Sequence, residues 1–287
     1  MPVSTAADSA PPPPFRTSSR RVPYGDDSEQ WFDLHRPRGK AAALGTVVLI
    51  HGGYWRGKYS ADLMGPMAAD LTARGWACPN IEYRRVGAGG GWPTILEDAI
   101  AASRQVAALV ARGELPGPLL VLGHSVGGQL ALLVARELRA SIAGVLALAP
   151  VTDVVETWRA RLGTDAAGNL LAASEGDPMT VANAASPRFQ LPIGVRSTVF
   201  HGVDDSAVPI EHTRRFVSEA RAAGDNVQLF DLGTLDHLAA IEPEASHWPL
   251  VTDALEALRH SAASATAPEA TTEPAVEQAQ SPAVEQA

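Results

Sequence analysis

Short apolar runs alternate with longer amphipathic segments along most of the chain. Runs rich in β-branched residues and leucine predict buried strands, and apolar positions that recur with a helical period predict helices. The expected strands lie at 46–50, 76–83, 119–122, 142–148, 197–200 and 227–230, and the expected helices at 61–73, 94–112, 130–135, 210–222 and 251–258. Two short segments, 21–24 and 30–35, predict an antiparallel pair ahead of them. This order predicts an α/β fold with a mostly parallel central sheet and helices on both faces.

Both ends of the chain are polar and poor in large apolar residues. Residues 1–20 are rich in Ser, Ala and Pro, and residues 261–287 contain Pro-Ala-Val-Glu-Gln-Ala twice. Such segments bury too little apolar surface to offset the entropy of ordering, so both are predicted to be disordered tails. The repeat is interpreted as a slipped duplication, with a docking peptide as the alternative. Residues 21–260 are predicted to form one domain, in which the weakly periodic stretch 151–192 is a small cap-like insertion of short helices over one side of a pocket.

Composition narrows the classes of function. The 287 residues are 46% hydrophobic, which suffices for a core without disulfides or a metal. Cys78 is the single cysteine, so an intrachain disulfide and a cysteine zinc site are excluded, and its thiol is expected to be buried and inert. The net charge of −9 argues against a nucleic-acid partner, and the apolar runs are too short to span a membrane. Because no basic-then-apolar signal pattern opens the chain, we expect a soluble cytoplasmic protein, as a monomer or homodimer.

The stretch Gly123-His124-Ser125-Val126-Gly127-Gly128 stands between an expected strand and an expected helix. A Gly-x-Ser-x-Gly sequence between a strand and a helix is the context of a nucleophile elbow. A serine on so sharp a turn has strained backbone angles, and the residues two before and two after approach too closely for a Cβ. The turn would expose the hydroxyl of Ser125 and direct the N–H of Val126 toward the same point. The alternative is an ordinary glycine-rich turn, since the motif by itself is common.

In parallel sheets, ligand sites lie beyond the carboxyl ends of the strands, so the residues that follow each strand are the candidates. The loop His51-Gly52-Gly53-Tyr54-Trp55 follows the first parallel strand. Its uncovered N–H groups, those of Gly53 and Tyr54, would form an oxyanion hole together with Val126. Trp55 would line the substrate pocket, and His51 is expected to form structural hydrogen bonds beneath the loop. An ordinary glycine turn with a core tryptophan is the alternative.

An acid and a base follow two later strands. Asp205 is favoured over its neighbour Asp204 as the acid, with Asp204 expected to cap a turn, and His237 follows the last strand. The chain order Ser125, Asp205, His237 is the order of nucleophile, acid and base in α/β-hydrolases and differs from that of other triad folds. The three independent placements agree, which favours catalysis over a glycine-rich turn.

These motifs resemble the α/β-hydrolase superfamily across residues 21–260. The resemblance rests on His51-Gly52-Gly53, the glycine-serine turn at 123–128, His201-Gly202-Val203-Asp204-Asp205-Ser206-Ala207-Val208-Pro209, and Asp236-His237. The form His-Gly-Gly-x-Trp is similar to the oxyanion loop of the kynurenine formamidase (arylformamidase) branch. Asp33 to Pro37 and Glu82-Tyr83-Arg84-Arg85 also resemble segments of that branch and of small esterases. Leu238 departs from it, because phenylalanine often follows the catalytic histidine there.

The resemblance implies a serine hydrolase that cleaves a small ester or aryl formamide without metal or cofactor. Ser125 would be the nucleophile, His237 the general base, and Asp205 the group that orients His237 and stabilises its cation. Trp55 and His124 are assigned to the substrate pocket, His124 being packed beneath the turn and outside the chemistry. Short acyl groups are expected. The alternatives are a small peptidase of the same fold and a non-catalytic binding protein.

Overall fold

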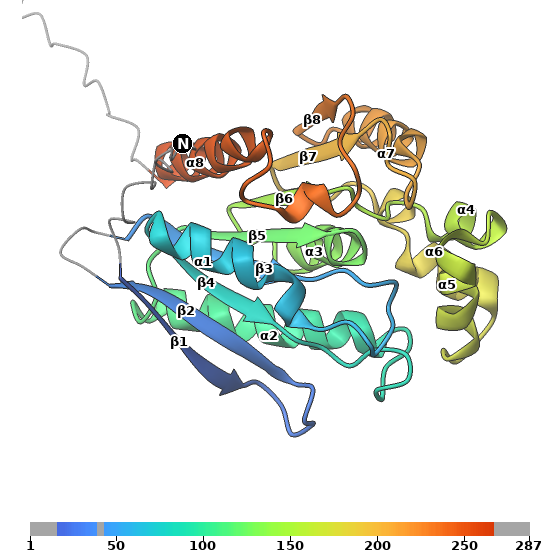
Figure 1. Ribbon diagram of the computed structural model, residues 1–287, viewed down its shortest axis with the longest axis horizontal. Helices are drawn as coiled ribbons and strands as arrows, with labels where there is room; N and C mark the ends of the chain where they lie inside the picture. The colour runs from blue at the N-terminus through green and yellow to red at the C-terminus, as the bar shows by residue number, and fades with distance from the viewer. Residues whose placement is uncertain (1–15, 39–42, 267–287) are drawn as a thin grey trace, which may run out of the picture.

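A computed structural model describes residues 16–38 and 43–266 (Figure 1). In the described chain eight strands form one sheet in the order β1-β2-β4-β3-β5-β6-β7-β8. The strands are β1 (Arg16–Pro23), β2 (Trp31–Arg38), β3 (Gly45–Ile50), β4 (Trp76–Ile81), β5 (Leu119–His124), β6 (Gly144–Leu148), β7 (Ser197–Gly202) and β8 (Val227–Leu232). The pairs β1–β2 and β2–β4 are antiparallel, and all later neighbours are parallel. The carboxyl ends of β3, β5, β7 and β8 therefore meet at one edge.

Helices cover both faces of the sheet (Figure 1). They are α1 (Gly65–Ala73), α2 (Thr94–Ala111), α3 (Val126–Glu137), α4 (Val154–Arg159), α5 (Leu162–Ala172), α6 (Pro178–Ala185), α7 (Ile210–Ala222) and α8 (Trp248–Thr266), with 3-10 turns η1 (Ala61–Met64), η2 (Pro187–Gln190) and η3 (Ala239–Ile241). One core cluster joins the sheet to α2, α3 and α7, and the other joins it to α1 and α8. None of the helices in the described ranges is both long and apolar enough to cross a bilayer.

The central strands are buried on both sides, which explains their unbroken apolar runs. In β3, Val48 and Ile50 belong to one core cluster, while Val47 and Leu49 belong to the other. A strand covered by helices on both faces needs apolar side chains at every position. The predicted α/β class is thus confirmed, and the strand order with its antiparallel start is that of the α/β-hydrolase fold. Cys78 is buried in β4, as expected, and burial raises the pKa of its thiol to about 12.

Two predicted boundaries are wrong by a few residues. The strand β1 begins at Arg16, inside the predicted N-terminal tail, because its backbone pairs with β2 along its whole length. Helix α8 continues to Thr266, past the predicted domain end at 260, in an alanine-rich stretch that favours helix. In that stretch Ser261 accepts a 2.6 Å hydrogen bond from Arg196. The remainder of both predicted tails, 1–15 and 267–287, lies outside the described residues.

The stretch 151–192 contains α4, α5, α6 and η2, grouped at one end of the molecule (Figure 1). Arg188 of η2 joins this group to α7. Its guanidinium donates to Asp153 (2.8 Å) at the start of α4 and to Glu219 (2.7 Å) on α7. The insertion is therefore fixed to the sheet domain by a charge-assisted network as well as by apolar contacts.

Candidate active site

Ser125 occupies the sharp turn between β5 and α3, with φ 56° and ψ −121°. A Cβ added at Gly123 would lie 2.0 Å from the carbonyl oxygen of Gly127, and one added at Gly127 would lie 2.0 Å from that of Ile50. Both positions therefore require glycine for the close approach that the sequence predicted. The N–H of Ser125 donates to the carbonyl of Leu148 across 2.8 Å, which anchors the strained turn to β6.

The structure brings the three predicted residues Ser125, Asp205 and His237 together. Nε2 of His237 lies 3.0 Å from Oγ of Ser125, and Nδ1 lies 2.7 Å from Oδ2 of Asp205. Because Asp205 is an acceptor, Nδ1 carries the proton, and Nε2 is free to accept from the serine hydroxyl. Asp204, the alternative acid, is exposed on the turn.

Asp205 is held by donors on both oxygens. Oδ1 accepts the N–H groups of Ala207 and Val208, each at 2.8 Å. Oδ2 lies 3.2 Å from Nε2 of a second histidine, His201, in addition to His237. Burial raises the pKa of Asp205, but the hydrogen bonds from His201 and His237 outweigh burial, so the pKa lies below its usual range. The carboxyl is therefore an anion that stabilises a positive charge on His237.

His124 lies directly beneath the loop that carries His237. Its Nε2 is 2.9 Å from the carbonyl oxygen of His237, and the two ring centroids are 4.6 Å apart. Burial lowers the pKa of His124 to about 3, so its ring is neutral and donates this hydrogen bond. His124 also lines the active-site cavity. It supports the loop of His237, in accord with the position predicted beneath the turn.

The loop at 51–55 passes against the elbow. A Cβ added at Gly52 would lie 3.0 Å from Cβ of Ser125, so glycine permits the close approach. Gly53 and Tyr54 both have positive φ, 117° and 56°. Among the hydrogen bonds of the described residues, none uses the N–H of Gly53, Tyr54 or Val126. These are the three N–H groups predicted for an oxyanion hole, and Gly53 and Tyr54 border the same cavity as Ser125.

A cavity of about 380 Å³ opens above Ser125. Its lining comprises Gly53, Tyr54, Tyr59, Leu63, His124, Ser125, Ser206, Ala207, Asp236, His237 and Leu238. Tyr59 and Leu63 were not predicted. Both lie close after the 51–55 loop, where aromatic and apolar residues beyond a strand end are the signal that could have identified them. Within the described residues, no group of three or more His, Cys, Asp and Glu side chains is placed to hold a metal ion.

The prediction that Trp55 lines the pocket is wrong. Trp55 is 1% exposed, belongs to the core and is absent from the cavity lining. Its indole N–H donates to Oε1 of Gln129 in α3, across 2.9 Å. Tyr54 and Trp55 both have positive φ, 56° and 58°, and of the two only Tyr54 lines the cavity.

No residue of 151–192, the predicted cap-like insertion, lines the cavity itself. The insertion instead supports the outer side of the 51–55 loop. Arg56 donates to the carbonyl oxygen of Gly163 across 2.7 Å. A Cβ added at Gly163 would lie 2.2 Å from the ring of Tyr54, which shows how closely α5 packs on that side chain.

Comparison with known proteins identifies the family and the fold. A model of the BD-FAE family matches residues 32–219, well over half of the chain and a span that includes Ser125 and Asp205. Esterase LipC of Mycobacterium tuberculosis (strain ATCC 25618 / H37Rv) is 27% identical over 237 residues, which cover 71% of this chain and 55% of that protein. The chain thus spans about half the length of this curated relative.

Solved structures of low sequence identity share the fold. Esterase B of Lactobacillus rhamnosis superposes with a TM-score of 0.74 at 18% identity, over 90% of this chain and 89% of that one. A truncated carbohydrate esterase from gut microbiota superposes with a TM-score of 0.70 at 18% identity, over 88% of this chain and 99% of that one. These similarities establish the α/β-hydrolase architecture.

Proposed function

This chain belongs to the BD-FAE family, and we propose that it is a serine esterase that hydrolyses small carboxylic esters through an acyl-enzyme. The observation that carries the proposal is the hydrogen-bonded series Ser125 Oγ, His237 and Asp205 at the floor of a cavity. A nucleophile within reach of a base, which is itself oriented by an acid, is the arrangement of nucleophilic catalysis. The name of the relative, esterase LipC, supports the same class of reaction.

In the first half-reaction, His237 takes the proton of Ser125 through Nε2 as Oγ attacks the ester carbonyl. Asp205 keeps the proton on Nδ1 and stabilises the imidazolium cation that forms. The developing oxyanion accepts from the N–H groups of Gly53, Tyr54 and Val126. Each such donor contributes about 3 kcal/mol to stabilisation of the transition state. His237 then protonates the leaving alcohol, and the acyl group stays on Ser125.

In the second half-reaction, water replaces the alcohol. His237 removes a proton from this water as the water attacks the acyl-enzyme, and the same N–H groups bind the second oxyanion. Collapse of that intermediate releases the acid and returns the proton to Ser125. Both halves use the same groups, so a change in the oxyanion hole slows acylation and deacylation together.

The walls of the cavity favour short acyl groups. Its large apolar lining residues are Tyr54, Tyr59, Leu63 and Leu238, and its volume of about 380 Å³ lies near the lower end of the range for ligand pockets. Trp55 lies in the core and does not narrow the cavity. An aryl formamide would use the same machinery. The position of Trp55 in the core removes one residue on which a formamide preference was based.

The test is a Ser125→Ala variant assayed with p-nitrophenyl acetate and with a fluorophosphonate probe. We expect the wild type to hydrolyse the ester and to be labelled at Ser125, and the variant to fold normally and lose both properties. Full activity in the variant would contradict the proposal, and an unlabelled, inactive wild type would favour the non-catalytic binding protein.

A substrate panel then separates the enzyme classes. It contains acetyl and longer aryl esters, a feruloyl ester, an acetylated sugar, N-formylkynurenine and a short peptide amide. We expect acetyl esters to give the highest kcat/KM. A higher value for N-formylkynurenine would assign a formamidase, a higher value for the peptide would assign a peptidase, and faster turnover of long-chain esters would contradict the short acyl preference.

A further inference from the structure

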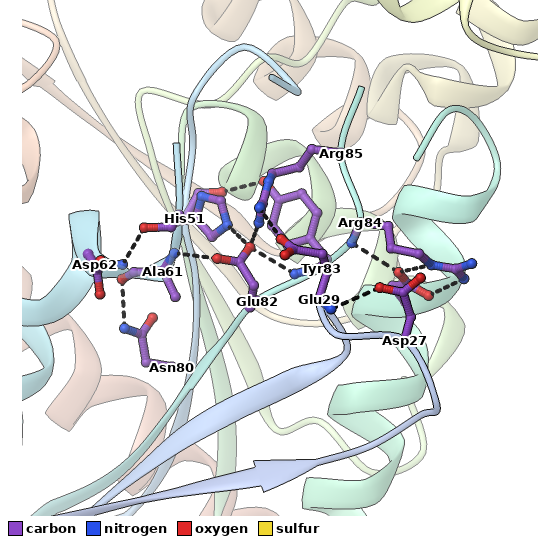
Figure 2. Close-up of polar contacts among 12 residues, drawn as sticks. Asp27, Glu29, His51, Ala61, Asp62, Asn80, Glu82, Tyr83, Arg84 and Arg85 are labelled. Atoms are coloured by element: carbon purple, nitrogen blue, oxygen red, sulfur yellow. Dashed lines mark hydrogen bonds and ion pairs between the residues drawn. The ribbon is translucent and has the colours of Figure 1, made fainter. Parts of the chain in front are cut away.

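A buried polar cluster contacts the start of the 51–55 loop, and Figure 2 shows its members His51, Glu82, Tyr83 and Arg85. Its centre is Glu82, which follows β4 and whose side chain is 2% exposed. One carboxylate oxygen, Oε1, lies 2.9 Å from Nε2 of His51 and accepts the N–H of Tyr83 at 3.0 Å. The other, Oε2, accepts the N–H of Ala61 at 2.9 Å. Both oxygens of Glu82 are therefore occupied by donors.

Arg85 balances the charge of this cluster. Its guanidinium forms ion pairs with Glu82 on one side and with Glu29 on the other. The Arg85 side chain is 4% exposed. A buried carboxylate without a partner is costly, so Arg85 allows Glu82 to remain behind the loop. Glu29 is partly exposed and connects the cluster to the turn after β1.

The cluster holds two successive carbonyl groups of the loop. Nδ1 of His51 lies 2.6 Å from the carbonyl oxygen of Gly52, and the hydroxyl of Tyr83 donates to the carbonyl oxygen of His51 at 2.9 Å. The ring of Tyr83 also stacks on that of His51, with centroids 4.5 Å apart. These contacts direct the carbonyl of Gly52 toward the ring of His51 and the carbonyl of His51 toward the hydroxyl of Tyr83.

Through the geometry of the peptide bond, the hydrogen bond at the Gly52 carbonyl also sets the direction of an N–H group of the oxyanion hole. In a trans peptide the C=O and the following N–H point in opposite directions. The carbonyl of Gly52 is directed toward His51, so the N–H of Gly53 in the same peptide is directed the other way. This N–H has no partner among the hydrogen bonds of the described residues, and Gly53 lines the cavity together with Ser125. The direction of this N–H therefore depends on the position of His51.

We propose that Glu82, Tyr83 and Arg85 are positioning residues for the oxyanion hole, acting through His51. This inference rests on the proposed esterase function. Two oxygens flank the ring of His51, the carbonyl oxygen of Gly52 at Nδ1 and Oε1 of Glu82 at Nε2. A glutamine at position 82 disrupts this arrangement, because its NH₂ group would face a donor at whichever oxygen it replaces. The ring of His51, and with it the Gly53 peptide, would then lose its orientation.

The same sequence stretch provides a matched control. Arg84 lies between two members of the cluster, but its side chain points toward α2 and binds both carboxylate oxygens of Asp98, at 2.7 and 2.8 Å (Figure 2). Arg84→Gln removes a partly buried ion pair of the same segment without touching His51. It reports the effect of a general loss of stability on the assay.

The experiment compares Glu82→Gln, Tyr83→Phe, Arg85→Met and Arg85→Lys with Arg84→Gln. Active sites are counted by complete fluorophosphonate labelling, kcat and KM are measured with p-nitrophenyl acetate, and Ki is measured for a trifluoromethyl ketone that forms an oxyanion on Ser125. We expect Glu82→Gln and Arg85→Met to lower kcat by about 10- to 100-fold. This decrease is smaller than the one caused by complete loss of an oxyanion-hole donor, because the N–H group is misdirected and not removed. KM should stay within about twofold, because both half-reactions slow together, and Ki should rise by about the same factor as kcat falls.

The remaining variants test whether the fall in kcat comes from a lost position of His51 or from a general loss of stability. Arg85→Lys should recover most of kcat, Tyr83→Phe should lower kcat several-fold, and Arg84→Gln should leave kcat per active site and Ki unchanged. Wild-type kcat and Ki in folded Glu82→Gln would overturn the inference and leave the esterase function intact. A loss in Arg84→Gln as large as in Glu82→Gln would also overturn it. If Glu82→Gln does not fold, Tyr83→Phe decides, since it removes one hydroxyl, and an unchanged kcat and Ki there overturns the inference.

Discussion

Trp55 donates its indole N–H to Oε1 of Gln129 across 2.9 Å, although the two residues are 74 positions apart in the chain. Gln129 in turn donates to the carbonyl oxygen of Ala185 at the end of α6, at 2.6 Å. This pair joins the 51–55 loop to the first turns of α3 and then to the insertion. The tryptophan that follows the two glycines thus stabilises the loop from inside the core.

Trp55→Phe is expected to destabilise the protein without changing acyl preference. The variant leaves the Oε1 of buried Gln129 without its donor, which costs about 1–3 kcal/mol. Urea unfolding should show this decrease in the free energy of unfolding, while the ratio of acetate to butyrate turnover stays the same. Trp158→Phe, in the insertion at a partly buried position, is the control and should cost less. A changed acyl preference with unchanged stability would return Trp55 to the substrate pocket.

Asp205→Asn is expected to lower kcat by about 10³- to 10⁴-fold, as does the same change in other serine triads. Asparagine favours the wrong tautomer of His237, so that Nε2 no longer accepts the proton of Ser125. The neighbouring Asp204→Asn is the matched control, because Asp204 is exposed, and it should change kcat less than about twofold. Steady-state kinetics with p-nitrophenyl acetate provide the measurement. Equal effects of the two variants would show that Asp205 has no special role.

The pH profile of kcat/KM is expected to have an acid limb with a slope of one. The hydrogen bonds to Asp205 hold its pKa below the usual range despite burial, and burial lowers the pKa of His124 to about 3. Neither group changes charge above about pH 5. His237 must be neutral to accept the serine proton, so kcat/KM is expected to fall toward acid pH. A slope of two, or a rate that is flat down to about pH 4, would contradict this assignment.

Much of the fold and of the candidate site could be predicted because the determining constraints are local. The buried strands could be recognised from continuous apolar runs, since both faces of the sheet are covered. Gly123 could be explained from a clash within five residues of chain, with the carbonyl oxygen of Gly127, whereas Gly127 was predicted from the motif and its close contact is with Ile50 of β3. Chain order and strand ends were enough to place Asp205 and His237 near Ser125, because parallel strands finish at one edge.

The errors concern side chains whose direction depends on distant packing. An indole after a glycine loop fits a substrate pocket and a core equally well, and only the position of Gln129 decided that Trp55 lies in the core. Tyr59 and Leu63 line the cavity because the chain turns back over Gly53, where a Cβ would lie 2.4 Å from Tyr59. The start of β1, Arg16–Arg20, is polar but forms a strand because its backbone pairs with β2.

By itself, the sequence determined the parallel sheet, the strained turn at Ser125 and the residues at the strand ends, since these follow from periodicity and from sterics over a few residues. Only the tertiary structure decided which partners those residues have. His51 contacts Glu82, 31 positions away, and Tyr59 and Leu63, which lie outside the sequence motifs, complete the wall of the cavity. Such contacts join elements that are far apart in the sequence. Which of the possible contacts forms depends on the free energy of burial of the whole packed chain, so a short stretch of sequence does not determine it.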